Sequence, residues 1–397
     1  MTGSSATYEA RSKSSAFWKT VASLFNFSRL RRYLPLGLAC GSQMARGENH
    51  ADFGYEYYIE DDNRIAVRTY SIDYEQKLLD WATIKGDLTY DGISGSTPTG
   101  TYYYPPGDGK IRTTKIDDIR RAMSVQVEFQ AGIQTITPGF SYSDERDYES
   151  YGISLSDAIA FNEKNTILNL GFARTFDSVL NYPRDGHSRD WQEKETTDGL
   201  IGISQLLTPN TIFSADFTFG YASGFLSDRY RQTEFVYPGH KFGVVRNENR
   251  PSDLYKQTLL TSITYYIESM NGSIEASYRF YHDSYEIYAN TLALTWHQWF
   301  GEHLILEPTF RFYEQGAASF YEPLFHTDPA NLQYYSSDYR LSEFYSLYYG
   351  AQLTVVVNSH LHLIAGYHRY TMTGLDDTVT AMYPQANVYT LGASLLW

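Results

Sequence analysis

The feature that most constrains the fold of this chain is a two-residue alternation of apolar and polar side chains. In Met123 to Ala131 the odd positions are Met, Val, Val, Phe and Ala, and the even positions are Ser, Gln, Glu and Gln. The same alternation occurs in 212–221 and in 273–283. Because successive side chains of a β-strand point to opposite faces, each segment predicts a strand with one apolar and one polar face.

Sixteen segments with this pattern follow residue 51. They cover 52–60, 64–77, 80–93, 122–131, 135–145, 149–161, 165–177, 196–207, 211–222, 254–268, 272–283, 286–299, 303–315, 341–357, 360–372 and 387–397. Roughly half of the chain would then be strand, about twice the share in soluble globular proteins. No run of about 18 apolar residues occurs, which excludes a helical membrane span. We therefore predict an all-β fold, a closed antiparallel transmembrane β-barrel of outer-membrane type with about 16 strands.

The lengths of the predicted connections support this class and give an orientation. With a periplasmic N-terminus, every second connection is a periplasmic turn, and all seven of these contain two or three residues. The gaps of 14 or more residues all fall on the other side, at 94–121, 178–195, 223–253, 316–340 and 373–386. Outer-membrane barrels have short periplasmic turns and longer extracellular loops. The terminal Trp397, which follows alternating apolar residues, resembles the signal recognised by the machinery that inserts such barrels.

The first 50 residues differ in kind from the rest of the chain. They are basic and rich in serine, and an arginine cluster at 29–32 precedes a short apolar run at 33–40, which is the arrangement of a signal peptide. We expect 1–50 to be an export segment that is removed and 51–397 to form one barrel domain. Cys40 is the one cysteine, so a disulfide framework is excluded.

The charge of the expected mature chain excludes one class of partner. Residues 1–50 hold seven of the 32 Lys and Arg and two of the 46 Asp and Glu, which leaves 25 basic residues against 44 acidic ones. This acidic balance argues against binding to nucleic acid.

One stretch near the end of the third predicted strand resembles a known family. The stretch is Tyr90-Asp91-Gly92-Ile93-Ser94-Gly95-Ser96-Thr97-Pro98-Thr99-Gly100. With Leu88 and the segment 55–65, it resembles a bacterial outer-membrane family catalogued as domain of unknown function 3570, whose members carry a similar Asp-x-x-Ser-Gly-x-x-Pro-Thr-Gly pattern. The matching residues are Asp91, Ser94, Gly95, Pro98, Thr99 and Gly100, whereas Gly92 lies where we expect Ala. The resemblance covers 52–397 and implies an exported barrel with no assigned activity.

The motif begins the predicted 28-residue loop at 94–121. Its Gly, Ser and Thr residues permit tight turns and would allow the loop to fold inward and narrow a pore. A simple corner between a strand and a loop is the alternative.

Six charged side chains are predicted to face the barrel lumen: Glu128, Asp216, Glu275, Arg279, Glu307 and Arg311. A lumen wall with both signs of charge suits a water-filled channel, because a basic side chain facing lipid at the midplane costs about 2–4 kcal/mol. Four acids against two bases favour a weak preference for cations. The alternative is a plugged barrel in which the interior polar groups bond to one another.

Groups with catalytic or metal-binding chemistry are sparse. His360 and His362 share one face of a predicted strand, and His368 lies further along it. We expect solvated histidines rather than a metal site, because the pattern places no acid or third histidine close enough to complete the ligands. The loop around 185–190 mixes the Asp, His and Ser of a hydrolase, but surface loops commonly have this composition. We expect no enzyme activity, no metal and no cofactor. The acids at 61–62 and 144–149 are candidates for divalent cations shared with lipopolysaccharide.

These observations lead to an expected function. We expect an outer-membrane channel for small hydrophilic solutes in a Gram-negative bacterium, in contact with outer-membrane lipid, lipopolysaccharide and the barrel-assembly machinery. The alternative is a plugged barrel that binds or assembles at the cell surface through its long loops. A soluble sandwich or propeller is a third interpretation.

Overall fold

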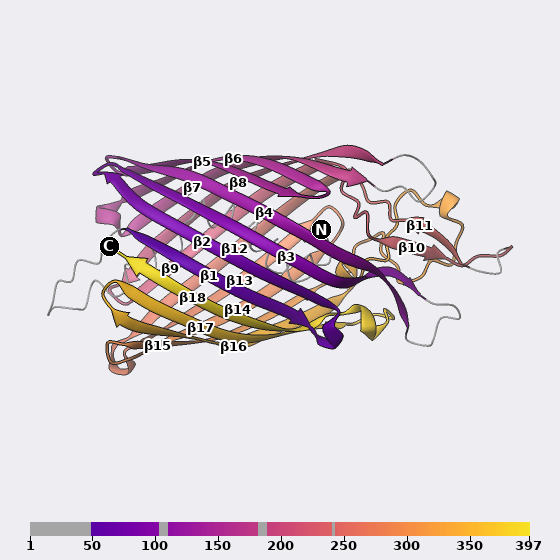
Figure 1. The fold of residues 1–397 in the computed structure, drawn as a ribbon. Helices are drawn as coiled ribbons and strands as arrows, with labels where there is room; N and C mark the ends of the chain where they lie inside the picture. Colours follow the sequence, from indigo (N-terminus) through magenta and orange to yellow (C-terminus); the bar gives the residue numbers. More distant parts are fainter. Residues whose placement is uncertain (1–48, 103–109, 182–188, 240–242) are drawn as a thin grey trace.

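The computed structural model describes residues 49–102, 110–181, 189–239 and 243–397. Sixteen antiparallel strands close into a barrel, in which β1 pairs with both β2 and β18 (Figure 1). The strands are β1 (His50–Glu60), β2 (Ile65–Leu79), β3 (Ala82–Tyr102), β4 (Ile111–Ala131), β5 (Gln134–Glu145), β6 (Tyr148–Phe161), β7 (Thr166–Asn181), β8 (Asp190–Thr208), β9 (Thr211–Gly224), β12 (Asp253–Ile267), β13 (Gly272–Asp283), β14 (Tyr288–Phe300), β15 (Leu304–Gln315), β16 (Phe344–Asn358), β17 (Leu361–Gly374) and β18 (Gln385–Leu396). The predicted fold class is confirmed.

Smaller elements complete the structure. A separate hairpin of β10 (Gln232–Phe235) and β11 (Val244–Asn247) lies beyond one end of the barrel (Figure 1). The described residues also contain six short 3-10 helices: η1 (Asp61–Asn63), η2 (Asn162–Lys164), η3 (Glu268–Met270), η4 (Pro329–Asn331), η5 (Tyr339–Leu341) and η6 (Thr380–Met382). Within the described ranges, no helix has the length and apolarity needed to cross a membrane.

The two ends of the barrel differ as the connection lengths predict. Seven short turns gather at one end, which we call the turn end and which also holds the C-terminal residue Trp397 (Figure 1). The opposite end, which we call the loop end, holds the long connections β9–β12, β15–β16 and β17–β18 together with the β10–β11 hairpin.

The alternation along each strand separates an apolar outer face from a polar inner face. In β9, Phe217 and Phe219 lie on the outside with exposed fractions of 41% and 44%, whereas Ser214 and Thr218 are buried on the inside. In the neighbouring β12, Leu259 is exposed and aligns with Phe217. Water-soluble proteins rarely expose many large apolar side chains on one surface. This outer face is therefore suited to contact with lipid.

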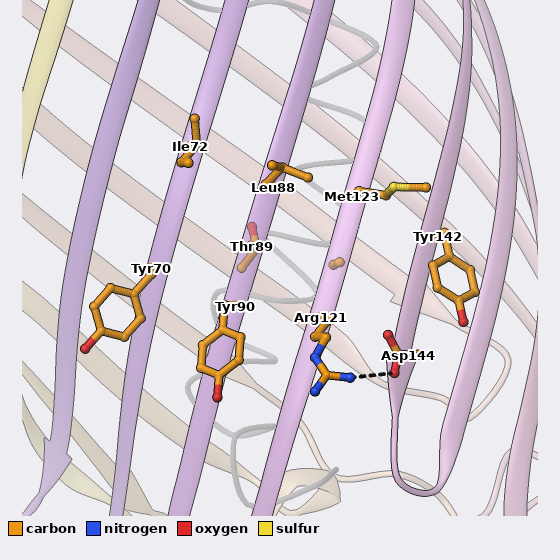
Figure 2. A pocket seen from close by; sticks show the side chains of 10 residues that line it. Tyr70, Ile72, Leu88, Thr89, Tyr90, Arg121, Met123, Tyr142 and Asp144 are labelled. Atoms are coloured by element: carbon orange, nitrogen blue, oxygen red, sulfur yellow. Dashed lines mark ion pairs between the residues drawn. The ribbon is translucent and has the colours of Figure 1, made fainter.

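A shallow groove of about 400 Å³ runs across the outer face of β2 to β5 (Figure 2). Its walls are outward side chains of these four strands: Tyr70, Ile72, Leu88, Tyr90, Met123 and Tyr142. At the rim, the guanidinium of Arg121 lies 3.8 Å from the carboxylate of Asp144. The groove is therefore apolar along its length and charged at one edge.

The structure corrects the predicted loop at 94–121. β3 continues to Tyr102 and β4 begins at Ile111, so most of this segment is a long hairpin. Two effects explain the error. Threonine favours strands as well as turns. The ladder between β3 and β4 also shifts register between Pro98 and Tyr102, and such an irregularity accommodates a proline.

Two other predicted loops also contain strand. β8 begins at Asp190 rather than at 196, and the β10–β11 hairpin occupies part of 223–253.

Candidate functional site: the loop-end cap and the lumen wall

Three connections fold over and into the loop end of the barrel. We call them the cap, which comprises 225–239, 243–252, 316–343 and 375–384. Backbone bridges join the first connection to the second, at Phe235 with Phe325 and at Asn249 with Tyr335. The third connection is joined to the second by a hydrogen bond between the hydroxyls of Tyr321 and Thr378, so the described part of the cap is one folded unit.

An apolar cluster seals the cap against the inner wall of the barrel. It unites lumen-facing residues of the first and last strands with cap residues: Tyr58, Ile65, Val67, Ile93, Tyr370, Met372, Tyr339, Met382 and Tyr383. A second cluster joins Tyr285 and Ile287 to Ala318, Tyr321 and Leu341. Where these two clusters lie, the inner face is therefore apolar and covered by the cap.

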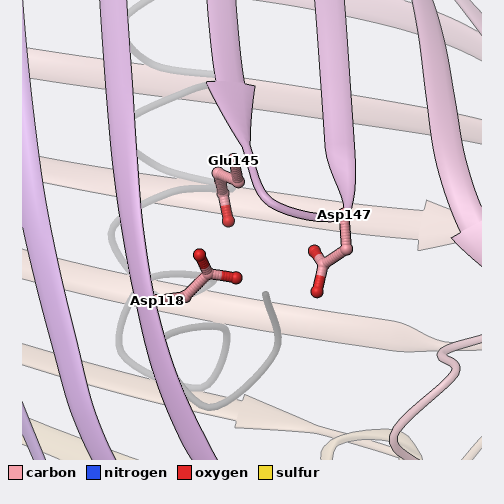
Figure 3. Close-up of side chains that lie close together, drawn as sticks. All are labelled: Asp118, Glu145 and Asp147. Atoms are coloured by element: carbon pink, nitrogen blue, oxygen red, sulfur yellow. The ribbon is translucent and has the colours of Figure 1, made fainter.

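Three carboxylates cluster at the loop end, and one of them binds the cap. Asp118 of β4, Glu145 of β5 and Asp147 lie close together on the inner side (Figure 3). Each lies within ion-pair distance of an arginine, respectively Arg146 at 3.8 Å, Arg120 at 3.8 Å and Arg229 of the cap. Each acid therefore has a cationic neighbour within the protein, and Asp147 anchors the cap through Arg229, although these carboxylates are of the type that ligates metals. Glu145 and Asp147, which the sequence suggests as candidates for divalent cations shared with lipopolysaccharide, are buried beside arginines.

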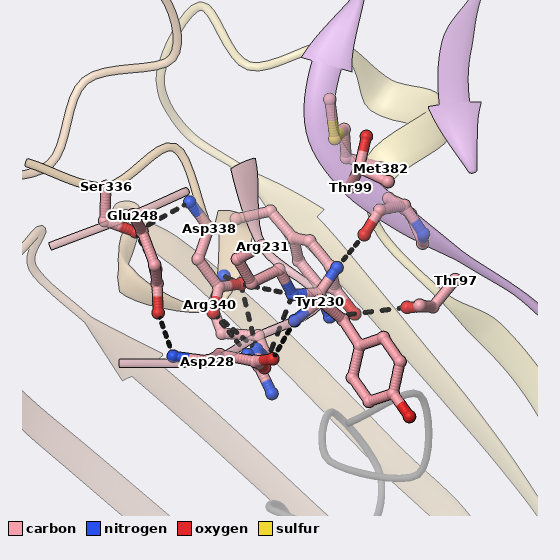
Figure 4. Close-up of polar contacts among 12 residues, drawn as sticks. Thr97, Thr99, Asp228, Tyr230, Arg231, Glu248, Ser336, Asp338, Arg340 and Met382 are labelled. Atoms are coloured by element: carbon pink, nitrogen blue, oxygen red, sulfur yellow. Dashed lines mark hydrogen bonds and ion pairs between the residues drawn. The ribbon is translucent and has the colours of Figure 1, made fainter. Parts of the chain in front are cut away.

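The centre of the cap is a buried network of alternating charges (Figure 4). Arg231 has an exposed fraction of 0% and lies 3.7 Å from Asp228 and 3.6 Å from Asp338. Arg340 pairs with both of these acids. Arg250 bridges Asp338 at 2.6 Å and Glu248 at 2.7 Å. Three arginines thus neutralise three carboxylates that come from two different connections.

The surroundings keep most of this network charged. Burial tends to raise the pKa of Asp338, but the guanidinium groups of Arg340 and Arg231 hold that pKa well below its usual range. The same balance of burial against Arg340 and Arg231 lowers the pKa of Asp228. For Glu248, burial outweighs the attraction of Arg250, and its pKa is raised. Asp228 and Asp338 therefore remain ionised near neutral pH.

On the barrel, the charge network binds to the motif at 91–100. Arg231 donates hydrogen bonds to the carbonyl of Pro98 and, at 3.3 Å, to the hydroxyl of Thr97 (Figure 4). The backbone N–H of Tyr102 donates to the Glu234 carboxylate of the cap at 3.2 Å. Thus the motif does not end a strand at a free loop; it extends β3 into a wall that binds the cap.

Other motif residues bond β3 to the neighbouring strands β2 and β4. Asp91 is fully buried, accepts a hydrogen bond from Thr69 at 2.6 Å and lies 3.5 Å from Arg120. The hydroxyl of Thr99 donates to the carbonyl of Arg112 across the hairpin at 3.1 Å. Ser94 is exposed, and the structure gives no reason for its identity.

Two motif glycines allow backbones to approach closely. Gly95 has φ +131°, and a Cβ there would collide with the carbonyl of Arg64. Gly100 has φ +94°, and a Cβ would lie 2.6 Å from the carbonyl oxygen of Gln232 and 2.8 Å from that of Ser337. Gly100 therefore sits between the two connections that build the cap, and only glycine fits this conformation and space.

Gly100→Ala is expected to loosen the cap without unfolding the barrel. Two backbone carbonyls would have to move, at a cost of about 1–3 kcal/mol. The measurement is the rate of limited proteolysis within 225–252 in the purified protein. Gly92→Ala on the same strand is the control, because no atom lies within 4 Å of a Cβ at that position. Equal cleavage rates in the two variants would contradict this reading of Gly100.

The structure places all six predicted lumen residues on the inner face, but their environments differ. Glu128 pairs with Lys85 at 2.7 Å, and Glu307 contacts His297 at 2.7 Å and accepts from Gln352 at 2.8 Å. The remaining four residues, Asp216, Glu275, Arg279 and Arg311, form no ion pair in the described part of the chain. Glu128 is thus neutralised by a lysine, whereas Glu307 is hydrogen-bonded to a histidine and to a neutral amide.

The other predicted residues lie apart from the cap. Trp397 is at the turn end, where its indole N–H donates to Gln76 at 3.0 Å. His360 is in a turn, and the ring of His368 stacks on Tyr348 in the barrel interior at 4.7 Å. The candidate hydrolase residues at 185–188 and the export segment at 1–48 lie outside the described residues. The sequence pattern missed Arg231, because no local signal distinguishes it from a surface arginine.

Comparison with solved structures finds other barrels at low identity. The structure described as "Bacterial polysaccharide outer membrane secretin" is 10% identical with a TM-score of 0.48, and the match covers 89% of this chain and 99% of that one. CdiB from Acinetobacter baumannii is 8% identical with a TM-score of 0.49, covering 88% of this chain and 60% of CdiB. The siderophore receptor PirA from Pseudomonas aeruginosa is 9% identical with a TM-score of 0.42, covering 89% and 62%. The chain thus spans about three-fifths of the length of the last two proteins.

Comparison by sequence gives the family. No curated protein matches the chain. The family described as "Protein of unknown function (DUF3570)" matches residues 37–394, which is nearly the whole chain and includes the motif at 91–100. The predicted family is therefore confirmed, and the chain belongs to the family described as "Protein of unknown function (DUF3570)".

Proposed function

We propose that the protein is a channel of the bacterial outer membrane that passes small hydrophilic solutes. The observation that supports this most is the division of the closed barrel into an apolar outside and a charged inside. Phe217 and Leu259 face outward, while Asp216, Glu275 and Arg279 face inward. Charged residues facing water inside and apolar residues facing lipid outside are the arrangement of a water-filled transmembrane barrel. The proposal includes no catalytic step.

The orientation and the lipid contacts follow from the two ends. We assign the turn end to the periplasm and the cap to the cell surface, because short turns face the periplasm in outer-membrane barrels. The groove on β2 to β5 would contact acyl chains, with Arg121 at the level of lipid or lipopolysaccharide phosphates. Export through the segment 1–50 and insertion by the barrel-assembly machinery at Trp397 belong to the same proposal.

A second candidate function is supported by the cap itself. The cap is tied to the barrel by a buried charge network and two apolar clusters, as a rigid binding or assembly surface would be. In this alternative the barrel is closed and serves as a platform for surface contacts.

Swelling of liposomes distinguishes the two candidates. Liposomes containing the purified full chain are placed in isotonic solutions of arabinose, glucose, sucrose or stachyose, and the swelling rate is measured. We expect swelling that decreases with the size of the sugar, and more rapid swelling when the cap is released by Arg231→Ala. Liposomes without protein are the control. Impermeability of both the wild type and the variant would contradict the channel and favour the closed platform.

A further inference from the structure

Lumen-facing cations on the barrel strands fall into two groups. Lys85, Arg120, Lys194 and Lys256 each have a carboxylate partner, at 2.7, 3.5, 3.1 and 3.2 Å respectively. Arg279 and Arg311 have no carboxylate within ion-pair distance in the described ranges. Arg279 donates to the hydroxyl of Thr291 at 3.3 Å, and its Nε is buried without a hydrogen-bond partner. Two cations of the lumen wall therefore retain donors that no protein acid satisfies.

The strand register brings these two arginines to the same part of the wall. Arg279 of β13 aligns with Thr291 of β14, and Arg311 of β15 aligns with Ala293 of β14. One strand separates them, which is roughly 10 Å in the hydrogen-bonding direction, and their partners on β14 lie two residues apart, which is roughly 7 Å along the strand. Both long side chains point into the lumen, so both can reach a single ligand. Because two adjacent cations without counter-charge repel each other, an anion between them would relieve this repulsion.

The neighbouring tyrosines show where the arginine pair lies along the barrel. Arg311 aligns with Tyr348 of β16, which aligns with Tyr370 of β17. Tyr370 belongs to the apolar cluster beneath the cap, and the guanidinium of Arg311 lies 5.8 Å from the ring centre of Tyr313. The arginine pair therefore lies directly on the turn-end side of the cap, where a solute that passes the cap would first meet the polar wall.

We infer that Arg279 and Arg311 form an anion-binding site on the lumen wall, which takes a small oxyanion such as the phosphate or carboxylate group of a hydrophilic solute. The planar guanidinium presents paired N–H donors that match the oxygens of either group. Thr291 adds a hydroxyl beside Arg279. This inference rests on the proposed channel and specifies the charge of its solutes, which reverses the cation preference expected from counting lumen charges.

Binding of inorganic phosphate tests the site without any requirement for conduction. The full chain in detergent is titrated with phosphate by calorimetry in chloride buffer, and acetate is titrated in parallel. We expect the double variant Arg279→Gln/Arg311→Gln to bind at least about 100-fold more weakly than the wild type, since each of the two arginines contributes at least one charge-assisted hydrogen bond and each such bond strengthens binding by about tenfold or more. Arg311→Lys keeps the charge but lacks the paired donors, and we expect an intermediate affinity.

Lys256→Gln is the matched control, because it removes one lumen cation that already has a partner, Asp198. Its phosphate affinity should equal that of the wild type. Equal affinity in the wild type and the double arginine variant, or no binding by the wild type, would overturn the site. Heat-modifiable migration on gels verifies that each variant retains a folded barrel.

Planar bilayer recordings then separate this inference from the proposed function. In a potassium chloride gradient we expect the wild-type channel to favour chloride, and millimolar phosphate to reduce its current. The double arginine variant should lose both effects, whereas Lys256→Gln should keep the phosphate block. Binding that depends on the arginines in a protein that never conducts would support the site and contradict the channel. A conducting protein with no arginine-dependent binding or selectivity would contradict the site and support the channel.

Discussion

Substitution of Arg231 with alanine is expected to detach the cap from the barrel. Arg231 is the fully buried cation that joins Asp228 and Asp338 of the cap to the carbonyl of Pro98 on β3. Its removal leaves buried carboxylates with fewer counter-charges and leaves the motif carbonyl without its donor. Breaking a buried ion pair on one side costs about 3–5 kcal/mol, which is the largest effect we expect from any single substitution in the cap.

The result is measured by protease cleavage within the cap and by channel conductance. Arg246→Ala is the matched control, because Arg246 belongs to the same connection, on β11, but is exposed. We expect more rapid cleavage within 225–252 and higher conductance for Arg231→Ala, with Arg246→Ala resembling the wild type. If the Arg231 variant resists protease as well as the wild type does, the network does not hold the cap.

The second large effect is expected from two neighbouring leucines in the middle of β12. Leu259 faces outward with an exposed fraction of 42% and aligns with Phe217 and Phe280. Leu260 faces the lumen and aligns with Asp216 and Arg279. Leu259→Arg would place a guanidinium in lipid near the midplane, at a cost of about 2–4 kcal/mol. Leu260→Arg introduces the same side chain into the lumen beside Asp216, where we expect a much smaller loss.

The measurement is the free energy of unfolding in lipid vesicles, followed by tryptophan fluorescence against guanidinium concentration. Each leucine variant serves as the control for the other, because residue type, strand and depth are the same. Similar losses at the two positions would show that the outer face does not contact lipid. A larger loss at Leu260 would reverse the assignment of inside and outside.

The cap and its motif illustrate why part of the site escapes sequence reasoning. The motif at 91–100 is visible in the sequence, and its glycines predict close backbone approach, but the approaching partner is not visible. Arg231 contacts Pro98 from 133 residues away, and Gly100 lies between carbonyls of two separate connections. Such contacts depend on the way in which the long connections fold back onto the barrel, and the local pattern of side chains contains no information about that path.

The charges in the lumen show a similar limit of prediction from sequence. Alternation is sufficient to predict that Glu128 and Arg311 face inward, because the side of a strand on which a residue lies is a local property. Whether that charge is free depends on the register of neighbouring strands. Glu128 is neutralised by Lys85, whereas Arg311 aligns with Tyr348 and Ala293 and has no acid near it. Counting charges along the sequence therefore does not identify which lumen charges are neutralised by a neighbour.

The class of fold, the approximate strands, the gathering of the short turns at one end and the apolar outer face can all be predicted from the amino-acid sequence. These follow from side-chain periodicity and connection length, which act over a few residues and need no knowledge of distant contacts. The folded structure was needed to show that β3 and β4 extend into a wall, that Arg231 joins the cap to that wall, and that Arg279 and Arg311 lack acidic partners within the described residues. Those features arise from strand register and from the folding of long connections, where the energy of a residue depends on partners far away in the chain.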